Sequence, residues 1–203
     1  MANTSRVQGA RPTKYLNGAA WNGQANLYFI PSGDATATFV GDFVKMDGTG
    51  DPTASGGNNL GVPSCIIAAT NQAVVGVVVA FVPNQVNLNS PQYRAGSTGR
   101  YCWVVDDPNV IFEIQGSNGT PAIGDVNANA NIAVGSGSTT TGQSGATLDI
   151  GTIAATATFM LRIVGFSQRA DNDLSTGNTA NAKYLVKINN HQLGSGTGVL
   201  GVL

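Results

Sequence analysis

The segment Val74–Val82, which reads VVGVVVAFV, constrains the fold of this chain most strongly. β-branched side chains favour extended backbone, and apolar residues on both alternating faces are typical of a strand covered on both sides. Pro83 follows immediately and cannot donate a hydrogen bond to a neighbouring strand, so the strand ends there. We therefore expect Val74–Val82 to be a buried central strand.

Composition favours strands throughout the chain. Of 203 residues, 27 are glycine, and among the 11 acidic residues only Glu113 is a glutamate. Glutamate supports helices, whereas glycine and aspartate favour turns. Hydrophobic residues make up 42% of the chain and charged residues 10%, which is typical of a folded protein rather than a disordered one. These features predict an all-β protein with a β-barrel or jelly-roll-like body.

The chain divides into three segments by composition. Residues 1–26 are polar and rich in glycine, with a few isolated apolar side chains, and they predict an extended N-terminal arm. Residues 27–193 contain the strand-like runs and predict the β body. Residues 194–203 form a glycine-rich C-terminal tail.

An internal repeat is visible within the body. The sequence Val40-Gly41-Asp42 recurs as Ile123-Gly124-Asp125, and other short matches keep the same offset of about 84 residues. The two halves would span residues 27–110 and 111–193. At their boundary, Asp107-Pro108-Asn109 lies between two strand-like runs and predicts the turn of a hairpin.

Charge and hydropathy exclude several classes of partner. The formal net charge is −1 and the ten basic residues are scattered singly, so we expect no nucleic-acid binding. No apolar run is long enough to span a membrane, and Met1–Gly9 has no apolar core of a secretory signal, so we expect neither membrane insertion nor export by that route.

Few residues suggest site chemistry. His191 is the only histidine and has no catalytic partner near it in sequence, while Cys65 and Cys102 lie in apolar runs and are expected to be buried free thiols. Asp171 and Asp173 begin like a calcium loop, but the glycine and the closing glutamate of that loop are missing. We expect no catalytic residue, no metal, no cofactor and no small-molecule substrate, and hence no enzyme.

The two ends of the chain supply the candidate contact residues. Ordering such segments costs about 1–2 kcal/mol per residue, so they must lie against something, either their own domain or neighbouring subunits. Aromatic and aliphatic anchors spaced along a polar segment suit insertion into pockets of a partner. The candidates in the arm and the tail are Arg11, Tyr15, Leu16, Trp21, Val199, Leu200 and Leu203.

Several stretches, spread over nearly the whole chain, resemble the head decoration, or cement, proteins of tailed bacteriophages. The stretches that carry the resemblance are Trp21–Asn26, Tyr28–Pro31, Gly41–Lys45, Val75–Val79 and Lys183–Leu193. The resemblance implies an all-β structural protein that is made in the cytoplasm of the host bacterium and binds the outer surface of the virion head. Its partners would be the major capsid protein, at junctions between subunits, and other copies of itself in a dimer or a trimer.

The residues suit this function independently of the resemblance. A cement protein requires a rigid β body, low charge and peripheral segments that reach across subunit boundaries, and this chain has these three features. The alternative hypothesis is a carbohydrate-binding β-sandwich on a virion or cell surface. Its stacking platform would come from Trp21, Tyr93, Tyr101 or Trp103.

Overall fold

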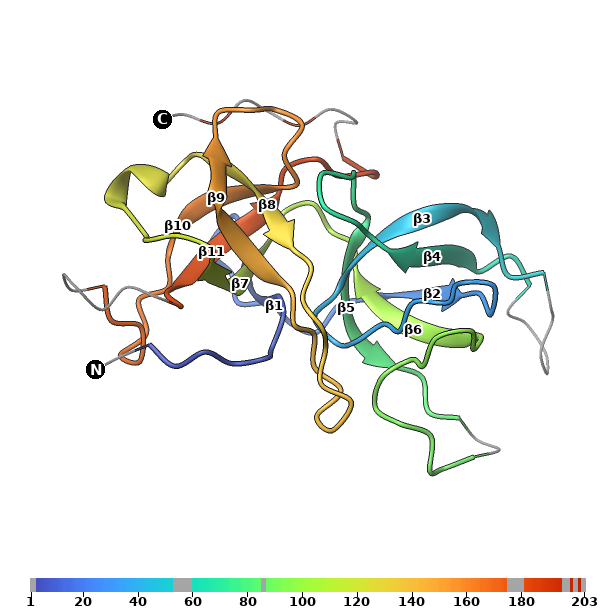
Figure 1. Cartoon of the computed structure of the whole chain (residues 1–203). Helices are drawn as coiled ribbons and strands as arrows, with labels where there is room; N and C mark the ends of the chain where they lie inside the picture. The colour runs from blue at the N-terminus through green and yellow to red at the C-terminus, as the bar shows by residue number, and fades with distance from the viewer. Residues whose placement is uncertain are drawn as a thin grey trace.

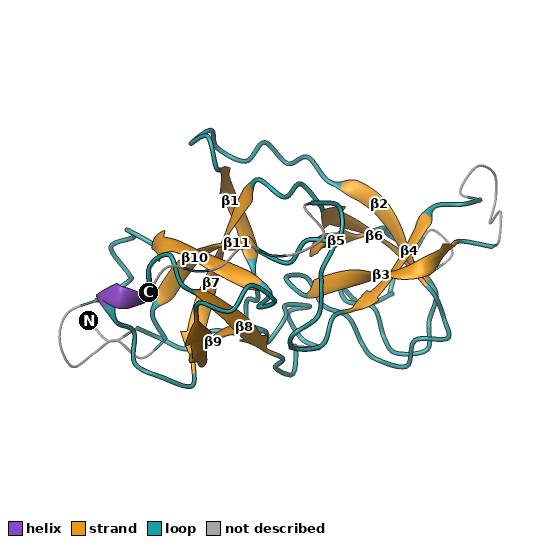
Figure 2. Ribbon diagram, turned by 90° about the horizontal axis from the view of Figure 1, so that it is seen from above, coloured by secondary structure: helices purple, strands orange, loops and turns teal. Residues whose placement is uncertain are grey.

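The structure is a computed structural model that describes residues 3–52, 60–84, 87–174, 181–194, 198 and 201. Within these residues the regular secondary structure is eleven β-strands and one short 3-10 helix, η1, which confirms the all-β prediction (Figure 2). The strands and η1 are β1 Arg11–Tyr15, β2 Asn26–Ile30, β3 Phe43–Gly50, β4 Pro63–Ile67, β5 Gly76–Phe81, β6 Arg100–Val105, β7 Val110–Ser117, η1 Ile123–Asp125, β8 Asn129–Ala133, β9 Thr147–Ala154, β10 Leu161–Phe166 and β11 Lys183–Ile188.

The first half of the chain forms a closed barrel in the order β2-β4-β3-β5-β6. Strand β2 is antiparallel to β6 from Asn26 opposite Val104 to Ile30 opposite Arg100. The barrel closes through a parallel contact between β2 and β4, where Phe29 lies opposite Ser64. Its interior holds a cluster of buried side chains: Tyr28, Ile30, Val44, Cys65, Val75, Val78, Cys102 and Val104.

The second half repeats this strand order. Strands β7, β11, β10, β8 and β9 are neighbours in one sheet, and a parallel pairing of Gly116 with Leu148 joins β7 to β9 and returns the sheet on itself. Each pairing in β2–β6 has its counterpart in β7–β11, including the single parallel one. Figure 1 shows the two barrels side by side, β2–β6 on the right and β7–β11 on the left.

The turn before the second strand of each half is also repeated. The Asp42 carboxylate accepts a hydrogen bond from the Phe39 N–H at 2.7 Å, and the Asp125 carboxylate accepts one from the Ala122 N–H at 2.8 Å. An aspartate side chain that closes such a turn satisfies a backbone donor that would otherwise be unpaired. The Gly-Asp pairs recognised in the sequence therefore occupy equivalent positions in the two halves.

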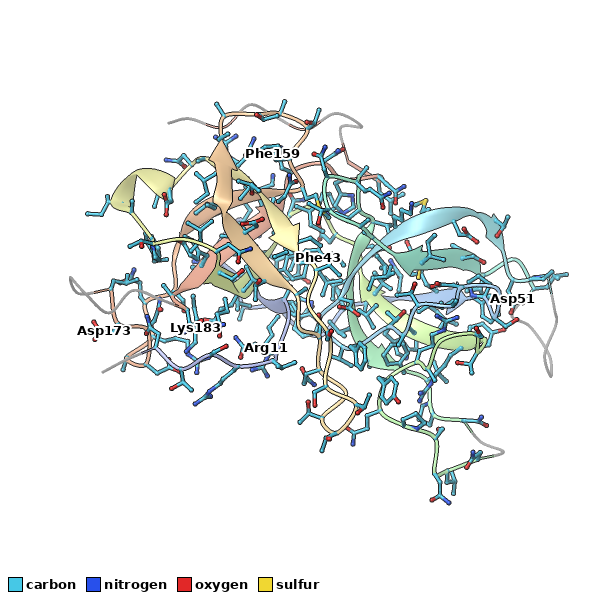
Figure 3. The ribbon with its side chains drawn as sticks, viewed as in Figure 1. Arg11, Phe43, Asp51, Phe159, Asp173 and Lys183 are labelled. Atoms are coloured by element: carbon cyan, nitrogen blue, oxygen red, sulfur yellow. The ribbon has the colours of Figure 1, made fainter. Side chains whose placement is uncertain are left out.

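A continuous core joins the two barrels. Phe43, Val74 and Val77 of the first half belong to the same buried cluster as Phe112 and Ile163 of the second. In Figure 3, Phe43 lies between the two barrels. The link is reinforced by the chain after β11, because the Val74 N–H donates to the Asn190 carbonyl at 3.0 Å and the Gln192 N–H donates to the Val74 carbonyl at 2.9 Å. Packing of this kind makes the halves one body rather than two linked beads.

Two sequence-based predictions about strands were wrong in detail. Strands β6 and β7 do not form a hairpin: β6 pairs with β2 and β5, whereas β7 pairs with β1, β11 and β9. The turn at Asp107-Pro108-Asn109 connects two barrels instead. The strand predicted at Val74–Val82 is β5, and its last residues, Val79 to Phe81, are only half-buried because they border surface hollows.

Part of the expected N-terminal arm is a strand. Residues 11–15 form β1, which pairs with β7 from Arg11 opposite Glu113 to Tyr15 opposite Val110. Ahead of it, the Arg6 N–H donates to Gln115 Oε1 at 2.9 Å, and the Ala10 N–H donates to the Gly41 carbonyl at 3.0 Å. Residues 3–15 therefore lie along the protein's own body, across the junction of the two halves.

Candidate contact surface

The chain folds back on itself directly after β1. Gly18 has a φ of 90°, a backbone conformation that favours glycine, and it reverses the chain. The Tyr15 N–H then donates to the Ala19 carbonyl at 2.8 Å, and the Trp21 N–H donates to the Thr13 carbonyl at 3.1 Å. This return segment covers the edge of β1 that β7 leaves open, which an exposed strand edge requires.

The two aromatic rings of this region are fixed by hydrogen bonds. The Tyr15 hydroxyl donates to Asn22 Oδ1 at 2.9 Å and lies 3.3 Å from Gln24 Oε1. Trp21 Nε1 donates to the Gln24 carbonyl at 3.2 Å. Both rings are half-buried and pack against the shared core, so each is held in place while part of its surface faces solvent.

Two hollows meet at Tyr15. One, of about 450 Å³, is lined by Tyr15 and Leu16 together with Asn17, Asp107 and Asn109. The other has a volume of about 390 Å³, and both Tyr15 and Asp107 line it as well. Leu16 is 52% exposed at the rim of the first hollow.

A third hollow joins the other two candidate residues. It has a volume of about 350 Å³, and Arg11 and Trp21 are among its lining residues. Val40 and Val79 of the first half and Gln143 of the second also line it, so it spans the junction of the two barrels. Arg11 is exposed on β1 at the lower side of the molecule in Figure 3. The structure thus brings Arg11, Tyr15, Leu16 and Trp21 together around β1, and we refer to these four residues as the β1 patch.

The β1 patch has an acidic border. The Asp106 carboxylate accepts hydrogen bonds from Asn26 Nδ2 at 2.9 and 3.0 Å and from the Tyr28 hydroxyl at 2.9 Å. Burial, followed by the hydrogen bond and the charge of Asp106, raises the pKa of Tyr28 well above its ordinary value. Tyr28 therefore remains protonated and donates to Asp106. These hydrogen bonds hold the Asp106 carboxylate in place on the lining of the 390 Å³ hollow.

The other candidates from the sequence lie elsewhere. Cys65 and Cys102 are free thiols inside the first barrel, with their sulfur atoms 3.9 Å apart. His191 is buried, its Nδ1 accepts the Leu193 N–H at 3.0 Å, and burial lowers its pKa. The tail residues Val199, Leu200 and Leu203 lie outside the residues that the structure describes.

Sequence reasoning missed the role of Arg94. Its side chain is fully buried and donates to four backbone carbonyls, those of Pro31, Asp34, Thr36 and Thr98, at 2.5–2.7 Å. It also pairs with the Asp34 carboxylate at 3.3 Å. An arginine in an asparagine-rich stretch gave no local signal of burial, because arginine is rarely buried unless it is paired.

The described part of the chain presents neither a metal site nor a membrane-spanning helix. No group of three or more histidine, cysteine, aspartate or glutamate side chains is arranged there to hold a metal ion. None of its helices is long and apolar enough to span a bilayer. No family model, curated protein or solved structure matches the chain.

Proposed function

We propose that this protein is a structural virion protein that binds the outside of a phage head and cements neighbouring major capsid protein subunits. The observation that carries the proposal is the β1 patch, in which a cation, an aliphatic side chain and two aromatic rings gather around three hollows. Tyrosine, tryptophan and arginine are the residues most enriched where protein partners bind tightly.

The body that carries the patch supports the same function. A cement protein must keep its contact surfaces at fixed positions when neighbouring subunits pull on them. The two barrels share one core, and β1 lies across their junction on the strand β7. A partner bound at the β1 patch would therefore be fixed relative to both halves, and binding only to the assembled lattice would stabilise the lattice by linkage.

Co-sedimentation with phage heads that lack the decoration protein tests the proposal. Truncation of residues 1–21 would be a poor test, because it would remove β1 and uncover β7. Leu16→Asp is better, since Leu16 is at the rim of a hollow and 52% exposed, and Leu193→Asp is its matched control at the same 52% exposure.

Wild-type protein is expected to bind the heads saturably, at a fixed ratio to capsid subunits. Leu16→Asp should weaken binding at least about tenfold, because it places a charge on a side chain that the capsid protein would cover in the complex. Leu193→Asp should bind like the wild type. Wild-type protein that stays in the supernatant at micromolar concentration would contradict the proposed function. Equal affinities of the two variants would contradict the role of the β1 patch.

A further inference from the structure

A separate hollow of about 680 Å³ lies beside the connection between β5 and β6. This volume is in the range of pockets that hold small ligands. Tyr93 and Tyr101 supply aromatic surface on its wall. The uncharged polar side chains that line it are Asn84, Asn87, Asn89, Ser90 and Thr98.

Both tyrosine rings are held from outside the hollow. Phe39 stacks on Tyr93 with ring centroids 4.9 Å apart and an interplanar angle of 15°. Phe29 packs against Tyr101 at 5.1 Å, and the Tyr101 hydroxyl donates to the Asp51 carboxylate. Rings fixed in this way lose little conformational freedom when a ligand binds, which is the basis of preorganised recognition.

The backbone around the hollow is fixed as well. Arg100 Nη1 donates to the carbonyls of Pro91 and Tyr93 at 2.6 and 2.7 Å, and its guanidinium lies 5.2 Å from the centre of the Phe81 ring. Arg94 anchors the same connection through its carbonyl bonds. The two arginines therefore hold the part of this connection from Pro91 to Thr98 in place.

The charge of the lining narrows the chemistry of a ligand. Arg100 is the one charged residue among the described residues that line the hollow, and its guanidinium donates to backbone carbonyls. The remaining polar groups are amides and hydroxyls, which both donate and accept hydrogen bonds. Such a surface matches a neutral ligand with many hydroxyl groups, and the aromatic rings match the apolar faces of a sugar ring.

We propose that the hollow lined by Tyr93, Tyr101 and the asparagines of the β5–β6 connection is a binding site for neutral carbohydrate. Sugar rings would pack on the two tyrosines, and their hydroxyls would bond to the side chains of Asn87 and Asn89. The site lies in the first barrel, and none of its lining residues belongs to the β1 patch. Its existence is therefore independent of the proposed function.

Titration of ¹⁵N-labelled protein with neutral oligosaccharides, followed by NMR, tests the proposal. The probes are maltotriose, cellotriose and triacetylchitotriose, each to 10 mM. At least one should cause saturable shifts confined to residues around the hollow. Tyr93→Leu should raise the dissociation constant roughly tenfold. Trp103→Leu is the matched control, because Trp103 is 39% exposed on β6 and does not line the hollow, and it should leave binding unchanged.

A second variant is needed because Tyr93→Leu also removes the stacking of Tyr93 on Phe39. The exposed pair Asn87→Ala and Asn89→Ala leaves the aromatic contacts intact and should weaken binding by a similar factor. The proposal is overturned if none of the three sugars shifts the residues around the hollow, if the shifts centre elsewhere, or if both variants bind like the wild type. Shifts caused by an unrelated peptide but by none of the sugars would assign the hollow to a protein partner and would also overturn it.

Discussion

The carboxylate of Asp42, in the turn before β3, accepts a hydrogen bond from the hydroxyl of Ser144, in the connection between β8 and β9. This contact joins the first half of the chain to the second, and Asp42 is only 4% exposed there. Burial raises the pKa of Asp42 to about 6, although the hydrogen bonds from Ser144 and from the Phe39 N–H act in the opposite direction. The junction of the two halves therefore contains a titratable group.

Asp42 predicts a pH dependence of stability. Between about pH 4 and pH 6 the folded state holds a proton that the unfolded chain has released, so the free energy of unfolding falls as pH rises through this window, by about 3 kcal/mol. Asp42→Asn should remove this contribution, while Asn Oδ1 can still accept from the Phe39 N–H. Urea denaturation at pH 4, 5, 6 and 7 measures the difference from wild type, with the exposed Asp47→Asn as control. Parallel pH profiles for wild type and Asp42→Asn would refute the prediction.

Arg94→Ala should be one of the most destabilising single substitutions in the chain. It would leave four part-buried backbone carbonyls without their donor and Asp34 without its ion-pair partner, and a buried unpaired group costs about 1–3 kcal/mol. We expect a loss of at least about 3 kcal/mol in the free energy of unfolding, measured by urea denaturation. Arg6→Ala, at an exposed arginine, should change it by less than about 0.5 kcal/mol. Similar losses in the two variants would show that the Arg94 bonds contribute little.

The crossing of the N-terminal segment over the first barrel requires glycine at position 9. A Cβ there would lie 2.6 Å from the Gly41 carbonyl oxygen, and the φ of Gly9 is 60°. Gly9→Ala should therefore cost about 3 kcal/mol or more, combining backbone strain with displacement of the crossing chain. Gly18 has a φ of 90°, but a Cβ added there would have no other atom within 4 Å. Gly18→Ala therefore introduces the backbone strain without a steric clash and should cost about 1 kcal/mol. Thermal unfolding followed by circular dichroism distinguishes the two, and equal costs would argue against the close crossing.

The two cysteines should be inert in the folded protein. Both are fully buried in the first barrel, and the pKa of Cys102 is raised, first by its hydrogen bond with Cys65 and then by burial. The reactive thiolate form of Cys102 is thus disfavoured, and burial keeps reagents away from both sulfur atoms. A thiol reagent should label neither residue within minutes under native conditions and both in denaturant. Rapid labelling of the native protein would show that the barrel opens readily.

Features encoded locally were predictable from sequence. The Gly-Asp pairs at Asp42 and Asp125 identified the repeat because each closes the same turn in its own half. The apolar run around Val77 identified β5, and the apolar setting of Cys65 indicated its burial. These predictions depend only on neighbouring residues, whose pattern survives in the folded chain.

Features formed by distant residues were not predictable. The segment RPTKY has little strand signal, and it becomes β1 because β7, far along the chain, offers an open edge to it. Tyr15 and Trp21 are contact candidates in the sequence, but the surface around them forms only because β1 pairs with β7, where Tyr15 lies opposite Val110. Arg94 gave no signal at all, since three of its four carbonyl partners lie in the separate connection between β2 and β3.

The thermal stability of the heads is the most direct test of the cementing function. Heads without decoration should be compared by calorimetry with heads saturated by wild-type protein and with heads mixed with Leu16→Asp at the same concentration. The proposed function predicts that wild-type protein raises the temperature at which the shell disassembles and that Leu16→Asp raises it less. Saturated binding with no change in that temperature would show that the protein decorates the shell without cementing it, and would contradict the central claim.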